Sequence, residues 1–337
     1  MREWQAVDKH TFHDEVCEQN EPAVLRRQVA DWPLVRMGKA STESVAEYLR
    51  GFGPDEPVKA FFAEPDTGGR YFYSDDFRGF NFQRRELPFA ELLDTLLQCI
   101  ADDNPPGIYA GAIPLRGPLQ SLLGENRLEL LDDSVDKLES IWIGNRGRTT
   151  THWDLPQNLA CVVHGRRRFT LFPPTELPNL YVGPLDNTLA GQPVSLVDPL
   201  QPDLERFPRF AQATQEARVA ELEPGDALYL PSMWFHHVEA LDPFGVLVNF
   251  WWRDAAPYML SPNFTLLHAL LTIRDMPQHE RDVWRQVFDY YIFSHDDDTL
   301  RHIPEDALGV LGDITPETAA KLRMILVRSL GGEPRRE

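Results

Sequence analysis

Residues 149–174 read TTTHWDLPQNLACVVHGRRRFTLFPP. Within this stretch, 159–163 and 166–172 are short runs with strand-forming residues, and a turn separates them, which predicts two β-strands. Further strands of the same kind are predicted at 140–144, 227–230, 234–240 and 246–252. Because no helical segment alternates with these strands, the pattern favours an antiparallel barrel or sandwich over a parallel α/β sheet. We therefore expect a mainly β protein with flanking helices.

The chain falls into three zones of different texture. Residues 1–134 mix strand-like runs with helices, and we expect them to pack on the core as α/β elements. Residues 135–253 form the β-rich core, and an insertion at about 174–218, rich in Pro, Asp and Asn, interrupts its strands. A connection of that length inside a compact domain is often functional, for instance as a lid. The alternative is that it only packs on the outside.

Residues 254–337 are predicted to be helical. Ser261-Pro262 is a typical helix start, and the helix that follows would carry Phe264, Leu267 and Leu271 on one face. Two further helices with apolar stripes are expected before the end of the chain. Such stripes usually belong to a packed core. The alternative is a helical dimer interface, because a barrel gains little from additional helices unless they cover or join something.

Composition excludes several classes of protein. Among 337 residues, 33 Lys and Arg stand against 52 Asp and Glu, and the net charge of -19 gives no general attraction for nucleic acid or an anionic membrane. The three cysteines are far apart, which argues against a disulfide framework and fits a reducing compartment. No segment has the length and apolar character of a signal peptide or a membrane span. We expect a soluble cytoplasmic protein with no nucleic-acid or membrane partner.

His152-Trp153-Asp154 is the first candidate for a metal site, since side chains at positions i and i+2 of a strand share one face. The pattern alone is weak, because the chain has ten histidines and His295-Asp296-Asp297 fits it as well. Context favours His152, which follows a Gly- and Thr-rich turn and precedes a strongly apolar strand. His295 lies in a run of acids at the end of a predicted helix, where a solvated cap is the better interpretation.

A third ligand is expected from residues 234–240, WFHHVEA. In a strand, His236 shares a face with Trp234 and Val238, whereas His237 shares the opposite face with Glu239. The second face carries the charge, so the first should point into the core. We therefore predict that His236 is the ligand and that His237 packs or forms hydrogen bonds on the outside.

Two imidazoles and one carboxylate occupy one face of an octahedron, and the three remaining positions are typical of non-haem Fe(II) oxygenases. Those positions can bind a 2-oxo acid and O₂, and the co-substrate carboxylate then needs a fixed cation. Arg167 shares a strand face with Phe169 and Leu171, and a guanidinium among apolar side chains should be paired with a carboxylate. The alternative is a partly exposed arginine with an acidic partner inside the protein.

These residues together resemble the Jumonji-C, cupin-like 2-oxoglutarate oxygenases, and most closely the asparaginyl hydroxylase that inhibits hypoxia-inducible factor and its bacterial cupin-like relatives. The resemblance rests on four stretches. They are 149–174, quoted above, 206–208 (RFP), 224–241 (PGDALYLPSMWFHHVEAL) and 248–252 (VNFWW). It covers about 140–252 at the level of motifs and implies a double-stranded β-helix, or jelly-roll, core.

The resemblance also implies roles for individual residues. Iron ligands would be His152, Asp154 and His236, in agreement with the alternation argument. The resemblance implies 2-oxoglutarate contacts at a further set of positions, namely Thr149, Asn158, Arg167, Asn249 and Trp251. Arg167 is a departure, since the closest relatives have lysine there. The family further suggests a homodimer formed by the C-terminal helices.

The implied function is an Fe(II)- and 2-oxoglutarate-dependent hydroxylase that acts on a protein side chain or a small molecule and releases succinate and CO₂. Two other classes remain open: a cupin-type metalloenzyme that uses no oxo acid, and a non-catalytic module that binds 2-oxoglutarate or metal. Lysine demethylation is a weaker possibility, because no chromatin-reading module accompanies the core. No motif of a serine or cysteine hydrolase or of a nucleotide-binding loop is found. The sequence does not identify the substrate.

Overall fold

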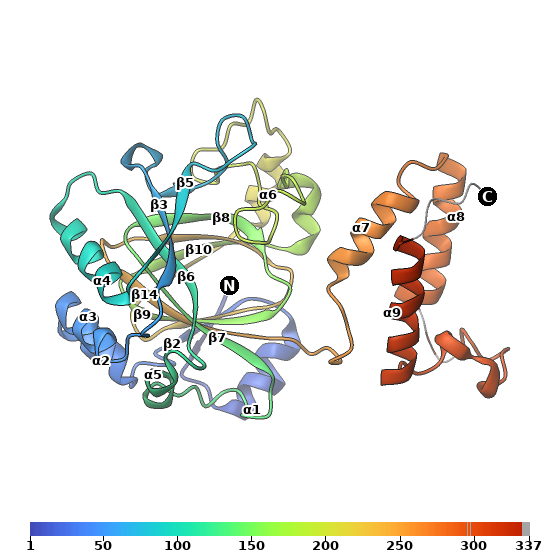
Figure 1. The fold of residues 1–337 in the computed structure, drawn as a ribbon, viewed down its shortest axis with the longest axis horizontal. Coiled ribbons are helices and arrows are strands. Elements are labelled where there is room, and N and C mark those ends of the chain that lie inside the picture. The colour runs from blue at the N-terminus through green and yellow to red at the C-terminus, as the bar shows by residue number, and fades with distance from the viewer. Residues whose placement is uncertain (295, 297, 332–337) are drawn as a thin grey trace. The chain divides into compact units, whose positions relative to one another are not determined.

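The computed structural model describes residues 1–294, 296 and 298–331. It contains two compact units, Met1–Arg253 and Asp254–Glu337. The first unit is built on eight strands that run from the end of the N-terminal zone to residue 252 (Figure 1). They are β7 (Lys137–Gly144), β8 (Gly147–Trp153), β9 (Gln157–His164), β10 (Arg167–Phe172), β11 (Arg218–Leu222), β12 (Ala227–Leu230), β13 (Phe235–Ala240) and β14 (Gly245–Trp252).

These eight strands are divided equally between two facing sheets. β7, β9, β12 and β14 lie in a nine-stranded sheet, and β8, β10, β11 and β13 lie in a five-stranded sheet. The chain passes repeatedly from one sheet to the other, and all pairings among the eight strands are antiparallel. This is a double-stranded β-helix, so the predicted fold class, mainly β with flanking helices around a jelly-roll core, is confirmed.

Strands from the N-terminal zone widen both sheets. In the nine-stranded sheet, the order is β1-β2-β12-β9-β14-β7-β6-β3-β5, and in the five-stranded sheet β4 pairs with β8. The added strands are β1 (Arg2–Gln5), β2 (Ala23–Arg26), β3 (Val58–Ala63), β4 (Arg70–Tyr71), β5 (Phe82–Leu87) and β6 (Gly107–Pro114). The sequence patterns did not predict β1, β2, β3, β6 or β11, and the Gly- and Thr-rich stretch before His152, which was expected to be a turn, belongs to β8.

Helices of the N-terminal zone cover the outer face of the nine-stranded sheet. Leu34, Leu49 and Leu92, from three of these helices, are fully buried in one cluster with Ile141 and Val248 of the sheet. A separate cluster fills the space between the two sheets. The helices are α1 (Lys9–Thr11), α2 (Pro33–Ala40), α3 (Thr42–Arg50), α4 (Phe89–Gln98) and α5 (Gln120–Glu125).

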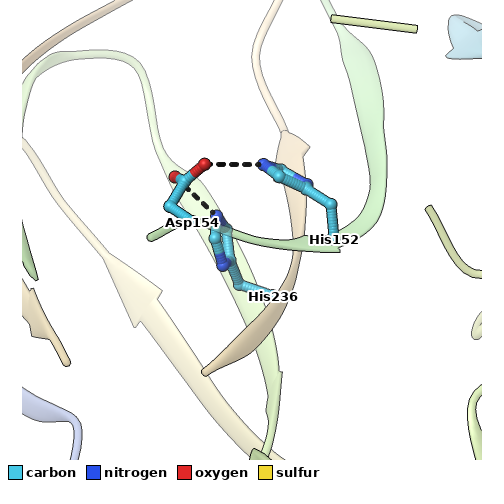
Figure 2. A group of neighbouring side chains, drawn as sticks. All are labelled: His152, Asp154 and His236. Atoms are coloured by element: carbon cyan, nitrogen blue, oxygen red, sulfur yellow. Dashed lines mark ion pairs between the residues drawn. The ribbon is translucent and has the colours of Figure 1, made fainter. Parts of the chain in front are cut away.

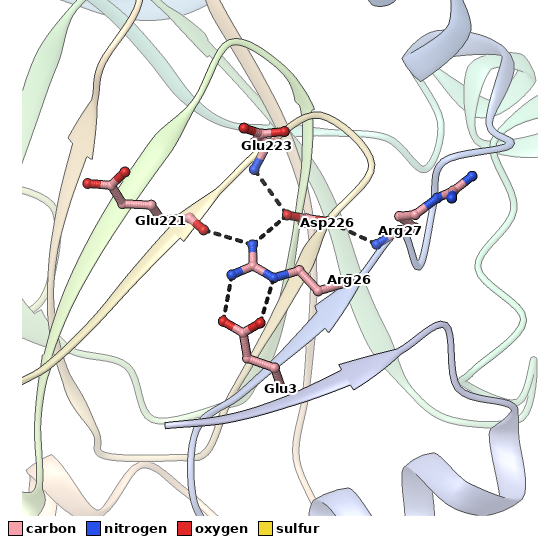
Figure 3. A network of polar contacts seen from close by, with 6 residues as sticks. All are labelled: Glu3, Arg26, Arg27, Glu221, Glu223 and Asp226. Atoms are coloured by element: carbon pink, nitrogen blue, oxygen red, sulfur yellow. Dashed lines mark hydrogen bonds and ion pairs between the residues drawn. The ribbon is translucent and has the colours of Figure 1, made fainter.

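A polar network joins the N-terminal strands to the jelly roll (Figure 3). Arg26 of β2 donates to both carboxylate oxygens of Glu3, at 2.6 and 3.1 Å, and to Asp226 Oδ2 at 2.7 Å. Asp226, in the turn before β12, also accepts from the backbone nitrogens of Arg27 and Glu223. The turn needs a glycine, because Gly225 has φ +104° and a Cβ there would lie 3.1 Å from Ala30 Cα. The network therefore fixes the edge of the sheet next to β12.

The insertion covers the outer face of the five-stranded sheet. Its helix α6 (Phe210–Glu216) places Phe210 and Ala213 against Phe172 and Phe235 of the sheet, and all four side chains are buried. Val194 forms an isolated bridge with His152 near the end of β8, and the next residue contacts the same strand, because Ser195 N donates to Thr151 O at 2.8 Å. The insertion therefore packs on the outside and also reaches the strand that carries His152.

The second unit consists of α7 (Pro262–Thr272), α8 (Gln278–Phe288) and α9 (Pro316–Gly331), with short turns between them. Its helices do not form the packed core that apolar stripes usually indicate. Phe264 is 63% exposed, Leu271 75% and Val327 70%, and Ala319 is the one buried apolar residue in the described part of the three helices. None of the helices in the described residues combines the length and the apolar composition needed to cross a bilayer.

Candidate active site

Three side chains predicted as metal ligands converge beside strands β8 and β13 of the five-stranded sheet (Figure 2). His152 lies on β8 and His236 on β13, and the antiparallel register places the two residues directly opposite each other. Asp154 follows the end of β8. Its Oδ1 lies 3.9 Å from His152 Nε2 and its Oδ2 lies 3.5 Å from His236 Nε2.

Two hydrogen bonds hold Asp154 beside the distant His236. Met233 N, in the turn before β13, donates to Asp154 O at 2.9 Å, and Ser232 Oγ donates to Leu155 O at 2.6 Å. The turn that follows one ligand strand is thereby joined to the turn that precedes the other. This explains how a ligand outside regular secondary structure takes a fixed position.

Backbone carbonyls set the orientation of both imidazoles. His152 Nδ1 lies 2.8 Å from Thr150 O, and His236 Nδ1 lies 3.0 Å from Trp234 O. Because a carbonyl oxygen can only accept, each Nδ1 carries the hydrogen and each Nε2 keeps a lone pair for a metal. Burial, helped by the neighbouring His236, lowers the pKa of His152 to about 4, so this imidazole is neutral at neutral pH.

The carboxylate completes a donor set that suits a transition metal. Burial alone would raise the pKa of Asp154, but the interactions of its carboxylate with His236 and His152 outweigh burial and lower it. One ligand atom from each of the three residues lies within 4.8 Å of the others. Two nitrogen donors and one oxygen donor on one side, with the other side open to a cavity, fit Fe(II).

A cavity of about 150 Å³ lies between the two sheets next to these ligands. All eight residues singled out from the sequence line it, although they come from five different strands and one turn. Five belong to the expected co-substrate set, Thr149, Asn158, Arg167, Asn249 and Trp251, and three are the candidate ligands His152, Asp154 and His236. The structure thus brings together every predicted site residue.

Arg167 faces this cavity from β10. The side chain is 4% exposed and lies among Phe169 and Leu171, as the strand alternation predicts. No carboxylate of a described residue forms an ion pair with it, and its Nε has no hydrogen-bond partner there. Burial lowers the pKa of Arg167, although the nearby Tyr109 opposes the shift. The alternative of an arginine paired with an acid inside the protein is therefore not what is found.

The burial of His237, on the face of the sheet opposite His236, differs from the prediction. His237 does lie on the other face, but that face is covered by the insertion, so His237 is 1% exposed and Glu239 is 8% exposed. Neither ring nitrogen of His237 has a hydrogen-bond partner among the described residues. In the competing pattern at the C-terminal end of the chain, His295 and Asp297 lie outside the described residues.

The sequence model of the family described as "Cupin-like domain" matches residues 9–257, which is more than half of the chain. The chain belongs to the cupin-like family. Relatives that match over most of their own length are consistent with this assignment. The human protein named "Bifunctional peptidase and (3S)-lysyl hydroxylase JMJD7" is 28% identical over 287 residues, which cover 77% of this chain and 85% of that protein.

Two further cupin-like relatives carry the name "tRNA wybutosine-synthesizing protein 5". The protein of Danio rerio is 32% identical over 263 residues, 73% of each chain, and that of Gallus gallus is 32% identical over 313 residues, 82% of this chain and 89% of its own. Among solved structures, E. coli ycfD is 16% identical, covers 96% of this chain and 68% of that chain, and has a TM-score of 0.41. The family assignment does not rest on this last likeness.

This cupin-like protein is a 2-oxoglutarate-dependent oxygenase that uses Fe(II), as the sequence predicts. The family, the hydroxylase among its relatives and the presence of a His–Asp–His set able to hold iron agree on this point.

Sequence patterns missed several residues that line the cavity of the cupin-like core. Tyr109 of β6 is half-buried beside Arg167, and its hydroxyl forms a hydrogen bond with Thr149, while desolvation raises its pKa to about 12. Phe61 and Tyr71 contribute from β3 and β4. Tyr109 lies in a strand that had no readable chemical signature, and only its register with β7 places it here.

The insertion supplies the remaining wall, as its length suggested. Leu189, Gln192 and Val194 line the cavity, and side chains of the N-terminal zone hold this segment. Tyr73 Oη donates to Asn187 O at 2.6 Å, and Arg84 Nη2 donates to Leu189 O at 2.6 Å. The amide oxygen of Gln192 is buried without a hydrogen-bond partner among the described residues.

Proposed function

We propose that this oxygenase is a hydroxylase in which His152, Asp154 and His236 hold Fe(II). The ligand atoms of these residues lie within 4.8 Å of one another, and no fourth His, Cys, Asp or Glu of the described chain joins the group. Three donors on one side of an ion leave its other positions for co-substrate and O₂. The backbone hydrogen bonds to both Nδ1 atoms support this assignment, because they fix each Nε2 toward the ion.

The observation that carries the proposal is the buried guanidinium of Arg167, which forms no ion pair with a carboxylate of the described residues. A buried cation without a counter-ion is costly, and the cost falls when a carboxylate binds in the geometry of a guanidinium fork. Arg167 shares a cavity with the three candidate ligands. We assign to it the carboxylate of 2-oxoglutarate that is remote from the metal.

A chain of hydrogen bonds along the cavity wall supports two of the other co-substrate contacts. Trp142 Nε1 donates to Asn249 Oδ1 at 2.6 Å, and Asn249 Nδ2 donates to Asn158 Oδ1 at 3.3 Å. These bonds orient both amides. Trp251 Nε1 is buried without a partner among the described residues, and Thr149 lines the same cavity. We assign Thr149, Asn158, Asn249 and Trp251 to the co-substrate pocket, with Tyr109 as an additional donor.

Bound Fe(II) and 2-oxoglutarate supply an O₂-dependent oxidation that converts the oxo acid to succinate and CO₂ and leaves a hydroxyl group on the substrate. The residues of the chain bind, orient and exclude water. Arg167 neutralises and orients a carboxylate, and Trp142 and Trp251 pack edge to face at 5.6 Å, where they limit the access of water. None of these roles requires a general acid or base.

The substrate side of the cavity favours an uncharged reacting group. Phe61, Tyr71, Leu189 and Val194 are aromatic or aliphatic, and Asp154 is the one acidic residue among the described residues that line the cavity. A substrate ammonium group would compete with the metal for that carboxylate. Gln192 offers a buried amide oxygen, which can accept from a donor on a protein side chain or on a small molecule.

Anaerobic titration with Fe(II) and 2-oxoglutarate tests the proposed function. We expect the weak visible charge-transfer band of the chelate, followed by release of succinate when O₂ is admitted. Bound iron without band or succinate would favour a cupin-type metalloenzyme that uses no oxo acid. A band without succinate, also in the presence of candidate substrates, would favour a binding module.

We also propose that the second unit joins two copies of the chain. Its own helices leave Phe264, Leu271 and Val327 exposed, and apolar surface of this extent usually marks an interface. A cytoplasmic location is proposed on separate grounds, because Cys17, Cys99 and Cys161 form no disulfide. Sedimentation velocity of the full chain tests the dimer, and cell fractionation tests the location.

A further inference from the structure

The strand that carries His152 is irregular directly beside this ligand. β13 and β8 pair His236 with His152 but Val238 with Thr149, so Thr150 and Thr151 together lie opposite His237. This is a β-bulge on β8. Bulges leave part of the ladder unpaired and redirect neighbouring side chains, and they are frequent next to active sites.

The bulge takes part in orienting the ligand. Thr150 O accepts the hydrogen of His152 Nδ1 at 2.8 Å, so the position of the bulged backbone sets the direction of the imidazole. Two contacts hold the bulge from outside. Thr150 Oγ1 donates to Tyr71 O at 2.7 Å, and Ser195 N donates to Thr151 O at 2.8 Å. The bulge is thus fixed to β4 on one side and to the insertion on the other.

Behind the bulge, several buried polar atoms of the described residues lack a hydrogen-bond partner. Nine buried side-chain nitrogen and oxygen atoms of the described residues have no hydrogen bond, and five of them belong to Arg70, Thr151, His237 and Glu239. Thr151 and His237 are each 1% exposed. A hydroxyl and a neutral imidazole each offer a donor and an acceptor, and native proteins rarely leave such groups unsatisfied.

The surroundings of these atoms are polar. Asp198 of the insertion forms an ion pair with Arg148 at 3.0 Å and lies 3.9 Å from Arg70 Nε. Asp198, Arg148 and Arg70 all act electrostatically on His237, and Glu239 follows two residues further along β13. Buried sites that hold ordered water are polar and offer several partners, whereas empty cavities are apolar.

We propose that ordered water behind the five-stranded sheet bridges Thr151 Oγ1 and His237, and that these two residues thereby position His152 through the bulge. Neither residue touches the metal position. Both are positioning residues, which act on the ligand through the backbone of Thr150. The proposal rests on the ligand set proposed above.

The matched pair Thr151→Val and Thr151→Ser tests the inference without turnover. Valine keeps the shape of threonine and removes the hydroxyl, whereas serine keeps the hydroxyl. Anaerobic competition with a chromophoric chelator measures the dissociation constant for Fe(II). We expect the valine variant to bind iron about 10- to 100-fold more weakly, as is typical when a residue behind a ligand is lost. The serine variant should bind as wild type. The visible spectrum of the Co(II) form should change in the valine variant alone.

The outcomes separate the two proposals. If the wild type does not bind one Fe(II) per chain, the ligand set is wrong. If it does, and the valine variant binds equally well with the same Co(II) spectrum, the inference is overturned while the ligand set stands. Should Thr151→Val fail to fold, His237→Leu against His237→Gln provides the same comparison, because glutamine keeps a donor and an acceptor. A crystal structure of the metal-loaded protein adds a direct readout: direct protein partners for Thr151 Oγ1 and His237, in place of water, would also overturn it.

Discussion

His152 and His236 lie opposite each other on neighbouring antiparallel strands, with their ring centroids 4.2 Å apart and interplanar angle 52°. Burial, together with the neighbouring His236, lowers the pKa of His152 to about 4, so at neutral pH the His152 imidazole is neutral and can lie this close to a second ring. The pair is therefore ready to bind a cation.

Removal of one ligand should abolish stoichiometric iron binding without unfolding the chain. We expect Asp154→Ala to lose Fe(II), because two imidazoles alone rarely hold the ion against exchange. Metal analysis after anaerobic gel filtration measures the iron content, and circular dichroism confirms the fold. His10→Ala is the control, since that side chain is 84% exposed. Full iron content in the Asp154 variant would contradict the assignment.

Loss of the buried cation should weaken co-substrate binding. We expect Arg167→Ala to raise the dissociation constant for 2-oxoglutarate well beyond tenfold, because a charge-assisted pair contributes about 1.5–3 kcal/mol. Calorimetry with the Fe(II) form under anaerobic conditions measures it. The adjacent Arg168→Ala is the matched control, because Arg168 points to the other face and pairs with Glu221 at 2.5 Å. If both variants bind 2-oxoglutarate equally well, Arg167 does not hold its carboxylate.

The apo protein should lose stability on acidification. In the unfolded chain a histidine takes up its proton near pH 6.5, but in the folded protein the pKa values of His152 and His237 are lowered to about 4, mainly by burial. Between these values the unfolded state binds more protons, so the free energy of unfolding falls as the pH falls from about 6.5 toward about 4, by up to about 3 kcal/mol for each histidine.

Urea unfolding in the presence of a chelator measures this dependence at several pH values. His152→Gln should show a smaller decrease over the same range, because it removes one of the two groups. A decrease of the same size in the variant would mean that His152 does not contribute.

The N-terminal network should stabilise the fold through its buried acid. We expect Asp226→Ala to lower the free energy of unfolding by about 2–4 kcal/mol, because it removes the partner of Arg26 and the acceptor for two backbone nitrogens. Glu3→Ala should cost about 0–1 kcal/mol, since Glu3 is half exposed. Urea unfolding of both variants makes the comparison. If both variants lowered the free energy of unfolding equally, the burial of Asp226 would not explain its contribution to stability.

The exposed stripe of α7 should mediate association. We expect Leu271→Glu to shift the full chain from dimer to monomer in sedimentation velocity, because it places a charge on an apolar surface. Thr265→Glu, an exposed change on the same helix that adds the same charge, should leave the distribution unchanged. A monomeric wild type would contradict the proposed dimer.

Strand patterns predicted an antiparallel barrel or sandwich and the inward direction of two site residues for a physical reason, whereas the jelly roll itself and most of the co-substrate positions were predicted from the resemblance to a family. Strand alternation is local, and it correctly placed His236 and Arg167 toward the interior. The covering of the opposite face is not local. His237 was expected outside, but the insertion buries it, and no pattern near residue 237 reports what packs against that face.

Residues that reach the site through distant pairings were also missed. Tyr109 lies near Arg167 because β6 pairs with β7. The sequence of neither strand indicates this register. For the apolar stripes of the C-terminal helices, the usual interpretation as a packed core was wrong. Phe264 and Leu271 have the spacing of a core face, yet the unit's own helices leave them uncovered, and helical periodicity alone cannot distinguish a core from an interface.

The two ligand segments lie on either side of the insertion in the chain. An ion held by His152 and Asp154 before it and by His236 after it would close a loop that contains the whole insertion and four complete strands. Iron would then act as a reversible cross-link, which restricts the unfolded chain much as a disulfide does. The described residues of this protein form no disulfide. The iron available in the cell would then determine the free energy of unfolding as well as the activity.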